Sequence, residues 1–255
     1  MKFSGKTVIV TGASRGIGAA IVKAFAKEGA LVIVNYLQNH EAANATVFAC
    51  KSFSGKAIAL QADVTDREAT DKLVKKTLDE FGKIDILVNN AFQFYSFNPE
   101  KRKMHWQLEW SDYQSQIDGT LKSTHGLIQA VLPAMLGKAD GSIVNIATNL
   151  VARPAVPYHE YTTAKAALIG YSRNLAMELG PLGVRVNSVA PGLVYPTDAS
   201  RKTKEDIKEN IISQTPLGRI ASPEDITGPV LFLASDWSRF MTGQTLFVDG
   251  GMVMG

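Results

Sequence analysis

Hydrophobic residues along the chain fall into short, β-branched runs separated by longer amphipathic stretches. Several of the short runs have no polar interruption, which is typical of parallel strands covered by helices on both faces. These runs predict strands at 7–11, 31–35, 57–61, 85–89, 142–147, 184–190 and 245–249.

The stretches between these runs have helical periodicity and predict helices at 17–28, 66–81, 121–136 and 158–179. Alternation of strand and helix is typical of βαβ units and predicts an α/β fold with a doubly wound parallel sheet. Ligands of such sheets bind beyond the carboxyl ends of the strands. The candidate functional residues are therefore those that follow a strand.

The composition is that of a soluble globular protein, with 45% hydrophobic and 20% charged residues among 255. We find no internal repeat or low-complexity linker, so we expect one domain over 1–255. The net charge of +3 gives no broad support for a nucleic-acid or membrane partner. The partner we expect is a small-molecule substrate.

Cys50 is the only cysteine and the four histidines are scattered, so the sequence offers neither a disulfide framework nor a thiolate or zinc site. The apolar run near the N-terminus is too short for a signal peptide or a membrane span. We therefore expect a reducing, cytoplasmic location.

The segment "TGASRGIG" at 11–18 follows the first predicted strand and opens a helix. Gly12, Gly16 and Gly18 remove side chains where the backbone must turn and approach a phosphate pair, and the helix directs its N-terminal N–H groups at that charge. In this position the segment predicts a dinucleotide site. The alternative interpretation is a tight structural turn.

The end of the second strand indicates which dinucleotide binds. An acidic residue there would accept hydrogen bonds from a ribose 2′-hydroxyl and repel a 2′-phosphate. This chain has Asn35 and Tyr36 instead, and Arg15 in the glycine loop can pair with a phosphate. The sequence therefore favours NADP(H), although Arg15 alone would also suit an ordinary surface position.

Six short segments occur along the chain in a characteristic order. They are "TGASRGIG" at 11–18, "DV" at 63–64, "NNA" at 89–91, "YTTAK" at 161–165, "PG" at 191–192 and "GQTLFVDGG" at 243–251. Taken together, they resemble the short-chain dehydrogenase/reductase family over essentially the whole chain, and within it most resemble the 3-oxoacyl-acyl-carrier-protein reductases. That resemblance implies a Rossmann-type sheet of seven parallel strands, hydride transfer with a nicotinamide cofactor without a metal, and a homotetramer, with a homodimer left open.

The resemblance also implies a set of cofactor-binding residues, drawn from the ends of several strands. In it the Val194 backbone contacts the nicotinamide carboxamide, and Lys165 reaches the nicotinamide ribose. The set comprises Gly12, Ser14, Arg15, Gly16, Ile17, Gly18, Asn35, Tyr36, Asp63, Val64, Asn90, Ala91, Tyr161, Lys165, Pro191, Gly192 and Val194.

Two tyrosines precede Lys165. Tyr161 and Lys165 stand at i and i+4 of a helix and share a face, so the ammonium group is expected to lower the pKa of the phenol and suit it to proton transfer. Tyr158 lies seven positions before Lys165, the spacing seen in enoyl-thioester reductases related to the family. We favour Tyr161 as the acid of a carbonyl reductase, with Tyr158 in the pocket wall, and keep enoyl reduction as an alternative.

At two catalytic positions the chain departs from the family. Thr148 stands where the family has the serine that holds the substrate oxygen, and it keeps a donor hydroxyl. Thr120 stands where the family has the asparagine of the proton relay, and it offers one hydroxyl in place of an amide. These changes leave open a third possibility, a weakly catalytic NADP(H)-binding module, which retention of Tyr161 and Lys165 disfavours.

Two further segments are candidates for the substrate site. Phe92 replaces the family's glycine and begins an aromatic-rich loop, 92–110, which either packs on itself or forms a wall for an apolar or aromatic substrate. The segment 193–220 resembles the family's mobile substrate-binding segment, with Thr197 matching the family threonine. Its charged run, 201–209, predicts a helix that is either a gating lid or simply solvated.

Overall fold

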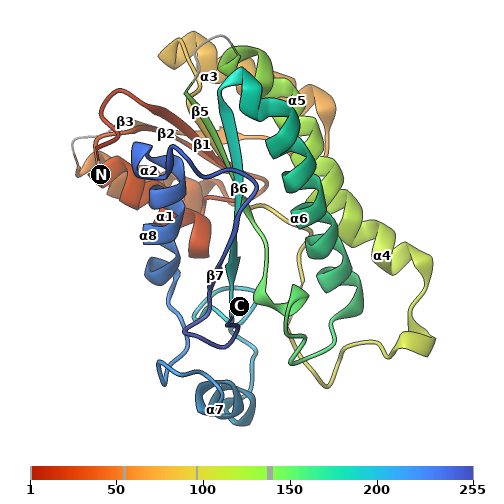
Figure 1. The fold of residues 1–255 in the computed structure, drawn as a ribbon. Coiled ribbons are helices and arrows are strands. Elements are labelled where there is room, and N and C mark those ends of the chain that lie inside the picture. The colour runs from red at the N-terminus through yellow and green to blue at the C-terminus, as the bar shows by residue number, and fades with distance from the viewer. Residues whose placement is uncertain (1, 54–55, 96, 137–139, 255) are drawn as a thin grey trace.

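A computed structural model of the chain describes residues 2–53, 56–95, 97–136 and 140–254. Within these ranges all strands lie in one parallel sheet of seven, in the order β3-β2-β1-β4-β5-β6-β7, so the expected fold class is confirmed (Figure 1). All seven predicted strands are present. They are β1 (Thr7–Val10), β2 (Leu31–Tyr36), β3 (Lys56–Gln61), β4 (Ile86–Asn89), β5 (Gly141–Ile146), β6 (Val184–Pro191) and β7 (Thr245–Val248).

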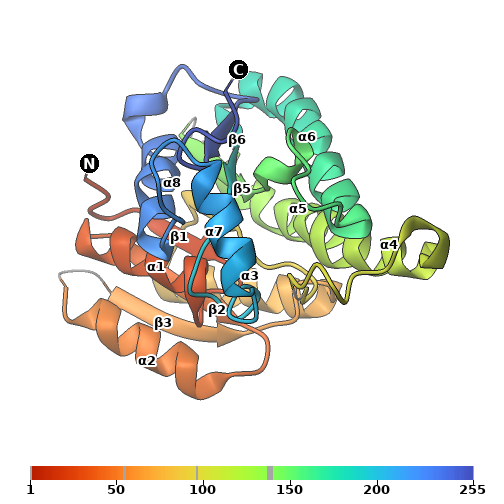
Figure 2. The same cartoon turned by 90° about the horizontal axis from the view of Figure 1, so that it is seen from below.

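Helices cover both faces of the sheet, as the uninterrupted strands require (Figures 1 and 2). One face is covered by α1, α2 and α8, and the other by α3, α5 and α6, with α4 against α6. The helices are α1 (Gly16–Lys27), α2 (His40–Lys51), α3 (Arg67–Phe81), α4 (Trp110–Ile117), α5 (Ser123–Met135), α6 (His159–Leu179), α7 (Glu205–Ser213) and α8 (Thr227–Ala234).

Local sequence explains where α3 begins and ends. The Asp66 carboxylate accepts hydrogen bonds from the backbone N–H groups of Glu68 and Ala69, and Gly82 ends the helix with φ of +72°. Leu73 and Val74 then lie on the face buried against the sheet. The prediction at 66–81 is therefore correct to within one residue.

The helix predicted at 121–136 is part of a longer helical segment. It begins at Trp110 as α4, passes through a π-helical turn at Asp118–Lys122, and continues as α5. The wider turn shifts the helical periodicity, so the buried side of α4 does not continue the apolar pattern of α5. The sequence pattern therefore locates α5 and misses α4.

A chain of buried amide and hydroxyl groups connects the sheet to α6. Asn89 Nδ2 donates to Asn145 Oδ1 at 2.8 Å, joining β4 to β5, and Asn145 Nδ2 donates to Ser172 Oγ of α6, also at 2.8 Å. Asn145 is fully buried. Because each group in this chain has a partner, the network fixes α6 over the strands without a desolvation penalty for unpaired groups.

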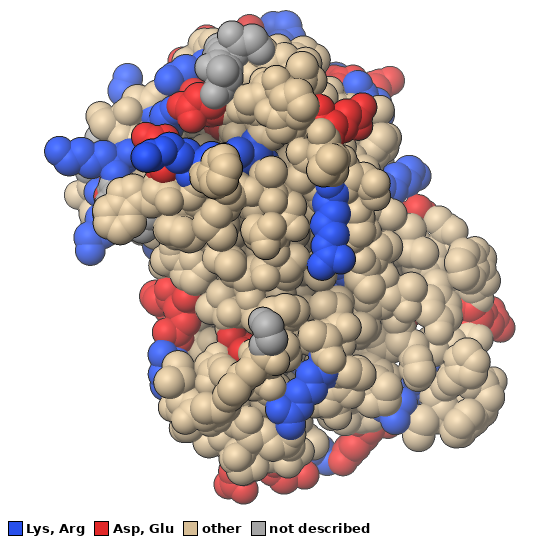
Figure 3. Space-filling model, in the orientation of Figure 1, with Lys and Arg blue, Asp and Glu red and all other residues tan. Residues whose placement is uncertain are grey.

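None of the helices in the described part of the chain is both long enough and apolar enough to cross a lipid bilayer. On the face drawn in Figure 3, acidic and basic side chains are interspersed and no large area carries one sign of charge. This distribution agrees with the small net charge.

We predict that Asn145→Ala lowers the free energy of unfolding by about 2–3 kcal/mol, because it leaves the buried Asn89 amide without its partner and removes the bond between β5 and Ser172. Asn174→Ala is the matched control, since Asn174 is exposed and donates only to Gly170 of its own helix. We expect the control to stay within about 0.5 kcal/mol of the parent. Equal urea midpoints for the two variants would contradict the structural role of the network.

Candidate active site

The glycine loop between β1 and α1 has a backbone that only glycine fits. Gly12 and Gly16 have φ of +60° and +56°, which L side chains rarely adopt. A Cβ atom at Gly18 would lie 2.5 Å from the Gly12 carbonyl oxygen. The loop therefore packs closely against the start of α1, whose N-terminal N–H groups suit a phosphate group.

Neighbouring strand ends hold this loop in place. Asn90, directly after β4, donates through Nδ2 to the carbonyl oxygens of Thr11 (2.9 Å) and Gly12 (3.2 Å). Asn35 accepts from the Gly12 N–H at 3.3 Å and donates to the carbonyl oxygen of Ala62 at 3.1 Å. The amide of Asn35 therefore ties the ends of β2 and β3 to the loop rather than facing outward.

Arg15, the cation of the glycine loop, forms an ion pair within the protein. Arg15 Nη1 lies 2.6 Å from Asp198 Oδ2, and the Arg15 side chain is 57% exposed. At the end of β2 the Tyr36 hydroxyl contacts His40 Nδ1 at 2.6 Å. The Asp63 carboxylate accepts hydrogen bonds from the N–H and the hydroxyl of Thr65. These groups surround the loop at the carboxyl edge of the sheet.

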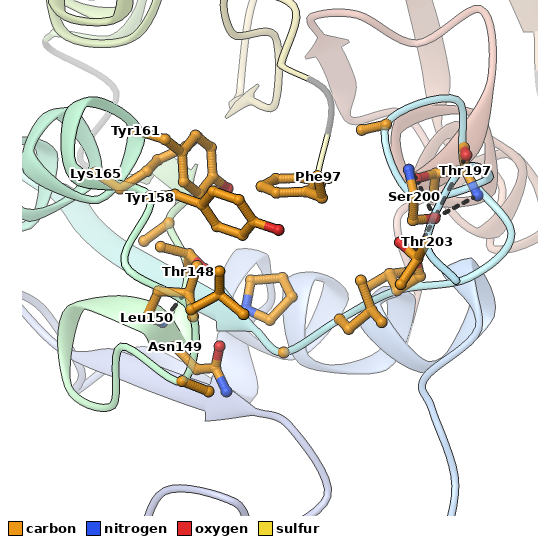
Figure 4. Close-up of a pocket in the computed structure, with 18 of the residues that line it drawn as sticks. Phe97, Thr148, Asn149, Leu150, Tyr158, Tyr161, Lys165, Thr197, Ser200 and Thr203 are labelled. Carbon is orange, nitrogen blue, oxygen red and sulfur yellow. Dashed lines mark hydrogen bonds between the residues drawn. The ribbon is translucent and has the colours of Figure 1, made fainter. Parts of the chain in front are cut away.

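A mostly apolar cavity lies beside the loop and is bounded by α6, the 92–110 loop and the 193–220 segment (Figure 4). It brings together residues predicted from five separate stretches of sequence. The sequence-predicted residues that line it are Ile17, Asn90, Phe92, Thr148, Tyr158, Tyr161, Lys165, Pro191, Gly192, Val194 and Thr197. Thr120 is not among the described lining residues.

Lys165 and Tyr161 are both buried in the wall of this cavity. Lys165 Nζ donates to the Ile146 carbonyl oxygen at 2.7 Å and lies 5.9 Å from the Tyr161 ring centroid. It also lies 5.1 Å from the centroid of Phe92, so this ring faces the cation.

Burial dominates the ionisation of both groups. It lowers the pKa of Lys165 to about 7 and raises the pKa of Tyr161, with hydrogen bonding to Thr148 acting in the opposite direction. The lowering of the Tyr161 pKa expected from the spacing is not seen, because both groups are desolvated and the Lys165 ammonium bonds to the backbone.

Tyr158 differs from Tyr161 in its position. It immediately precedes the first residue of α6, and its hydroxyl points into the open part of the cavity (Figure 4). Burial raises the pKa of Tyr158 to about 12. Both tyrosines therefore reach the same cavity from the start of one helix.

Thr148 and Thr120 have different environments. Thr148 follows β5, and its hydroxyl accepts from the Leu150 N–H at 3.4 Å. Thr120 is buried within the π-helical turn, and its Oγ1 has no hydrogen-bond partner among the described residues. At the preceding Gly119, a Cβ atom would lie 2.5 Å from Gln93 Cβ, so the 92–110 loop passes tightly over this turn.

Sequence reasoning missed the contacts that hold the 193–220 segment. The hydroxyls of Thr197 and Ser200 are 2.8 Å apart, and Ser200 Oγ donates to the Val194 carbonyl oxygen at 2.7 Å. Asp198 forms an ion pair with Arg15 of the glycine loop. The only sequence signal for the contacts of Thr197 and Ser200 was the turn-forming composition of "TDAS" at 197–200, and the pair with Arg15 had none.

The helix expected at 201–209 lies further along the chain, as α7. Lys204 has an extended backbone conformation, with ψ of 156°, and the acidic side chains of Glu205 and Asp206 lie in the first helical turn, where they complement the dipole. Residues 201–204 therefore precede the helix, because the acidic pair favours its start at 205.

Comparison with known proteins identifies the class. Residues 12–253 match a family model described as Enoyl-(Acyl carrier protein) reductase. A 3-oxoacyl-[acyl-carrier-protein] reductase from Synechocystis sp. is 40% identical over 252 residues, which cover 98% of this chain and 97% of that protein.

Solved structures with a similar fold are also dehydrogenases/reductases. A dehydrogenase/reductase from Sinorhizobium meliloti superimposes with a TM-score of 0.88 at 35% identity, covering 99% of this chain and 97% of that one. A short-chain type dehydrogenase/reductase from Mycobacterium ulcerans has a TM-score of 0.90 at 26% identity, covering 99% and 91%.

The chain therefore belongs to the short-chain dehydrogenase/reductase family, whose members are oxidoreductases that use a nicotinamide cofactor. Over nearly its full length it is similar to 3-oxoacyl-[acyl-carrier-protein] reductases.

The environment of Lys165 predicts how stability depends on pH. The folded pKa of about 7 lies below the ordinary value of 10.5, so burial of the charged amine costs most below pH 7 and this cost falls as the pH rises toward 10.5. We expect Lys165→Met to raise the Tm of the protein at pH 6 by at least about 3 °C.

This gain should shrink steadily between pH 7 and pH 10. Lys76→Met, on the exposed side of α3, is the control and should shift the Tm little at any pH. A gain for Lys165→Met that is independent of pH would show that the folded protein binds this proton as tightly as the unfolded chain does.

Proposed function

We propose that the protein reduces the carbonyl group of a 3-oxoacyl thioester or a related ketone, using NADPH as the hydride donor and Tyr161 as the proton donor. The observation that carries this proposal is that Tyr161, Thr148 and Lys165 line one cavity beside the glycine loop. The similarity to 3-oxoacyl-[acyl-carrier-protein] reductases supports the choice of substrate.

The residues at the carboxyl edge fit a nicotinamide dinucleotide. The close packing at Gly18 and the start of α1 suit its phosphates, while Ile17 and Asn90 connect the loop to the cavity. Toward the nicotinamide end, we assign the Val194 backbone and the Lys165 amine as partners. When bound, the nicotinamide supplies or accepts the hydride.

Thr148, Tyr161 and Lys165 then each have a role in transferring a proton to the substrate. The Thr148 hydroxyl holds the carbonyl oxygen, and Tyr161 transfers its Oη proton to that oxygen as the charge develops. A raised pKa keeps Tyr161 protonated at neutral pH, which is the form an acid must have before reduction. Lys165, in its charged form, stabilises the tyrosinate that remains.

There are two alternative functions, and the first of them depends on Tyr158. Its hydroxyl points into the cavity and the matching family model is described as an enoyl reductase, so enoyl-thioester reduction by Tyr158 is the second candidate. A weakly catalytic NADP(H)-binding module is the third, motivated by Thr148 and Thr120. Retention of the buried Tyr161–Lys165 pair argues for catalysis, because cofactor binding alone needs no phenol there.

We propose a single domain over 1–255 that works in the cytoplasm as a homotetramer or homodimer, with 193–220 as its substrate-binding lid. Exposed apolar side chains such as Trp237 and Phe240 are compatible with subunit contacts.

The central test follows NADPH absorbance with a short 3-oxoacyl thioester and with the matching 2-enoyl thioester. Tyr161→Phe should lower kcat for the 3-oxoacyl substrate by about 10²–10⁴-fold while NADPH binding, followed by fluorescence, remains. Tyr158→Phe is the matched control and should retain most of the activity.

The opposite pattern, turnover of the enoyl thioester that depends on Tyr158, would replace the proposal by its alternative. Tight NADPH binding with no turnover of either substrate would favour the binding module.

The choice of NADP(H) is tested at Arg15. Arg15→Ala should lower kcat/KM for NADPH by about 10–100-fold and leave NADH almost unaffected, because only the 2′-phosphate loses a charge-assisted hydrogen bond. Asp198→Asn should increase the affinity for NADPH, since it releases Arg15 from its internal partner. An equal loss with both cofactors would remove the case for phosphate recognition by Arg15.

A further inference from the structure

Three aromatic side chains of the 92–110 loop, those of Phe92, Tyr95 and Phe97, pack directly on the two cavity tyrosines. The Tyr95 ring stacks on Tyr161 with centroids 5.4 Å apart and an interplanar angle of 26°. The Phe97 ring meets Tyr161 edge to face at 5.1 Å and Tyr158 at 5.4 Å. The loop packs on itself, since Tyr95 also contacts Phe97, and it contributes Phe92 and Phe97 to the cavity wall.

Hydrogen bonds fix this aromatic cluster at both sides. The Tyr95 hydroxyl donates to Glu160 Oε1 at 3.1 Å, which anchors it to the first turn of α6. The Phe97 N–H donates to the Ala199 carbonyl oxygen at 3.2 Å, which joins the loop to the 193–220 segment. An ion pair between Glu100 and Lys204 also joins the 92–110 loop to the 193–220 segment.

Phe97 consequently stands between the tyrosines and the 193–220 segment, at the edge of the cavity (Figure 4). The cavity wall also includes apolar side chains from that segment, Leu193, Ile207 and Ile211. Lys165 is the only charged side chain among the described lining residues, and its Nζ bonds to the backbone. The space next to the reacting carbonyl is therefore apolar, lined with aromatic rings and without a partner for a charged group.

We infer that Phe97 is a specificity-determining residue and that the preferred substrate is an uncharged ketone with a ring-sized apolar group, such as an aryl ring, attached to the reacting carbonyl. This inference rests on the proposed function and names its substrate class. A flat ring stacks against Phe97 and Tyr158, whereas a long flexible chain must displace the loop from the 193–220 segment.

The test compares N-acetylcysteamine thioesters that differ only in their acyl end: 3-oxo-3-phenylpropanoyl and 3-oxododecanoyl. We expect the parent protein to favour the phenyl substrate by at least about tenfold in kcat/KM. Phe97→Ala should remove that preference, mainly by raising KM for the phenyl substrate. Phe97→Leu should also reduce the preference for the phenyl substrate, because it keeps an apolar side chain but removes the ring.

Phe94→Ala is the matched control, because Phe94 lies on the same loop but is 66% exposed. It should keep the preference of the parent. Equal kcat/KM values for the two thioesters in the parent, or a preference that survives in both Phe97 variants, would overturn the inference.

A separate binding measurement distinguishes failure of the inference from failure of the proposed function. If the parent turns over neither thioester, reduction of 3-oxoacyl thioesters is excluded, and acetophenone and 2-octanone are compared by thermal shift with NADPH present. A larger Tm increase with acetophenone that is lost in Phe97→Leu would support the inference about the cavity. Equal increases with the two ketones would overturn it.

Discussion

Parallel hydrogen bonding between the strands is the constraint on which the rest of this structure depends. A parallel pair cannot be joined by a tight turn, so each connection must cross over a face of the sheet from the carboxyl end of one strand to the amino end of the next. All seven carboxyl ends therefore lie at one edge, and the residues after β1, β4 and β5 become neighbours although they are far apart in sequence. For this reason Asn90 bonds to Gly12 and also lines the same cavity as Thr148.

The position of α6 over that sheet determines the chemistry of the cavity. The network through Asn145 and Ser172 anchors the middle of the helix, so its first turns are held against the end of β5. Lys165 is thereby buried, and no acidic group in the described residues forms an ion pair with it. Its proton is weakly held while that of Tyr161 is tightly held, which is the ordering that burial imposes on a base and an acid placed in one apolar site.

The strands and the glycine loop could be predicted because their signals are local. Buried strands have uninterrupted apolar runs, and Gly18 is required by the close approach of its own loop. The side chain of Asn35 illustrates the limit: its position beside the loop was predictable, but its bonds to Gly12 and Ala62 depend on strands adjacent only in space. The pairing of Arg15 with Asp198 joins residues separated by most of the chain and has no local signal at all.

The π-helical turn at Asp118–Lys122 has a consequence for insertions and deletions. A π turn holds one residue more than an α turn, so removing one residue there would restore a continuous α-helix. Everything on the N-terminal side would then rotate by about 100° relative to α5. The buried side of α4 would then turn away from α6. The 92–110 loop before it would lose its packing on Tyr158 and Tyr161. The shape of the substrate cavity thus depends on the helical phase set by a single residue, so we expect this turn to tolerate substitutions far better than changes in length.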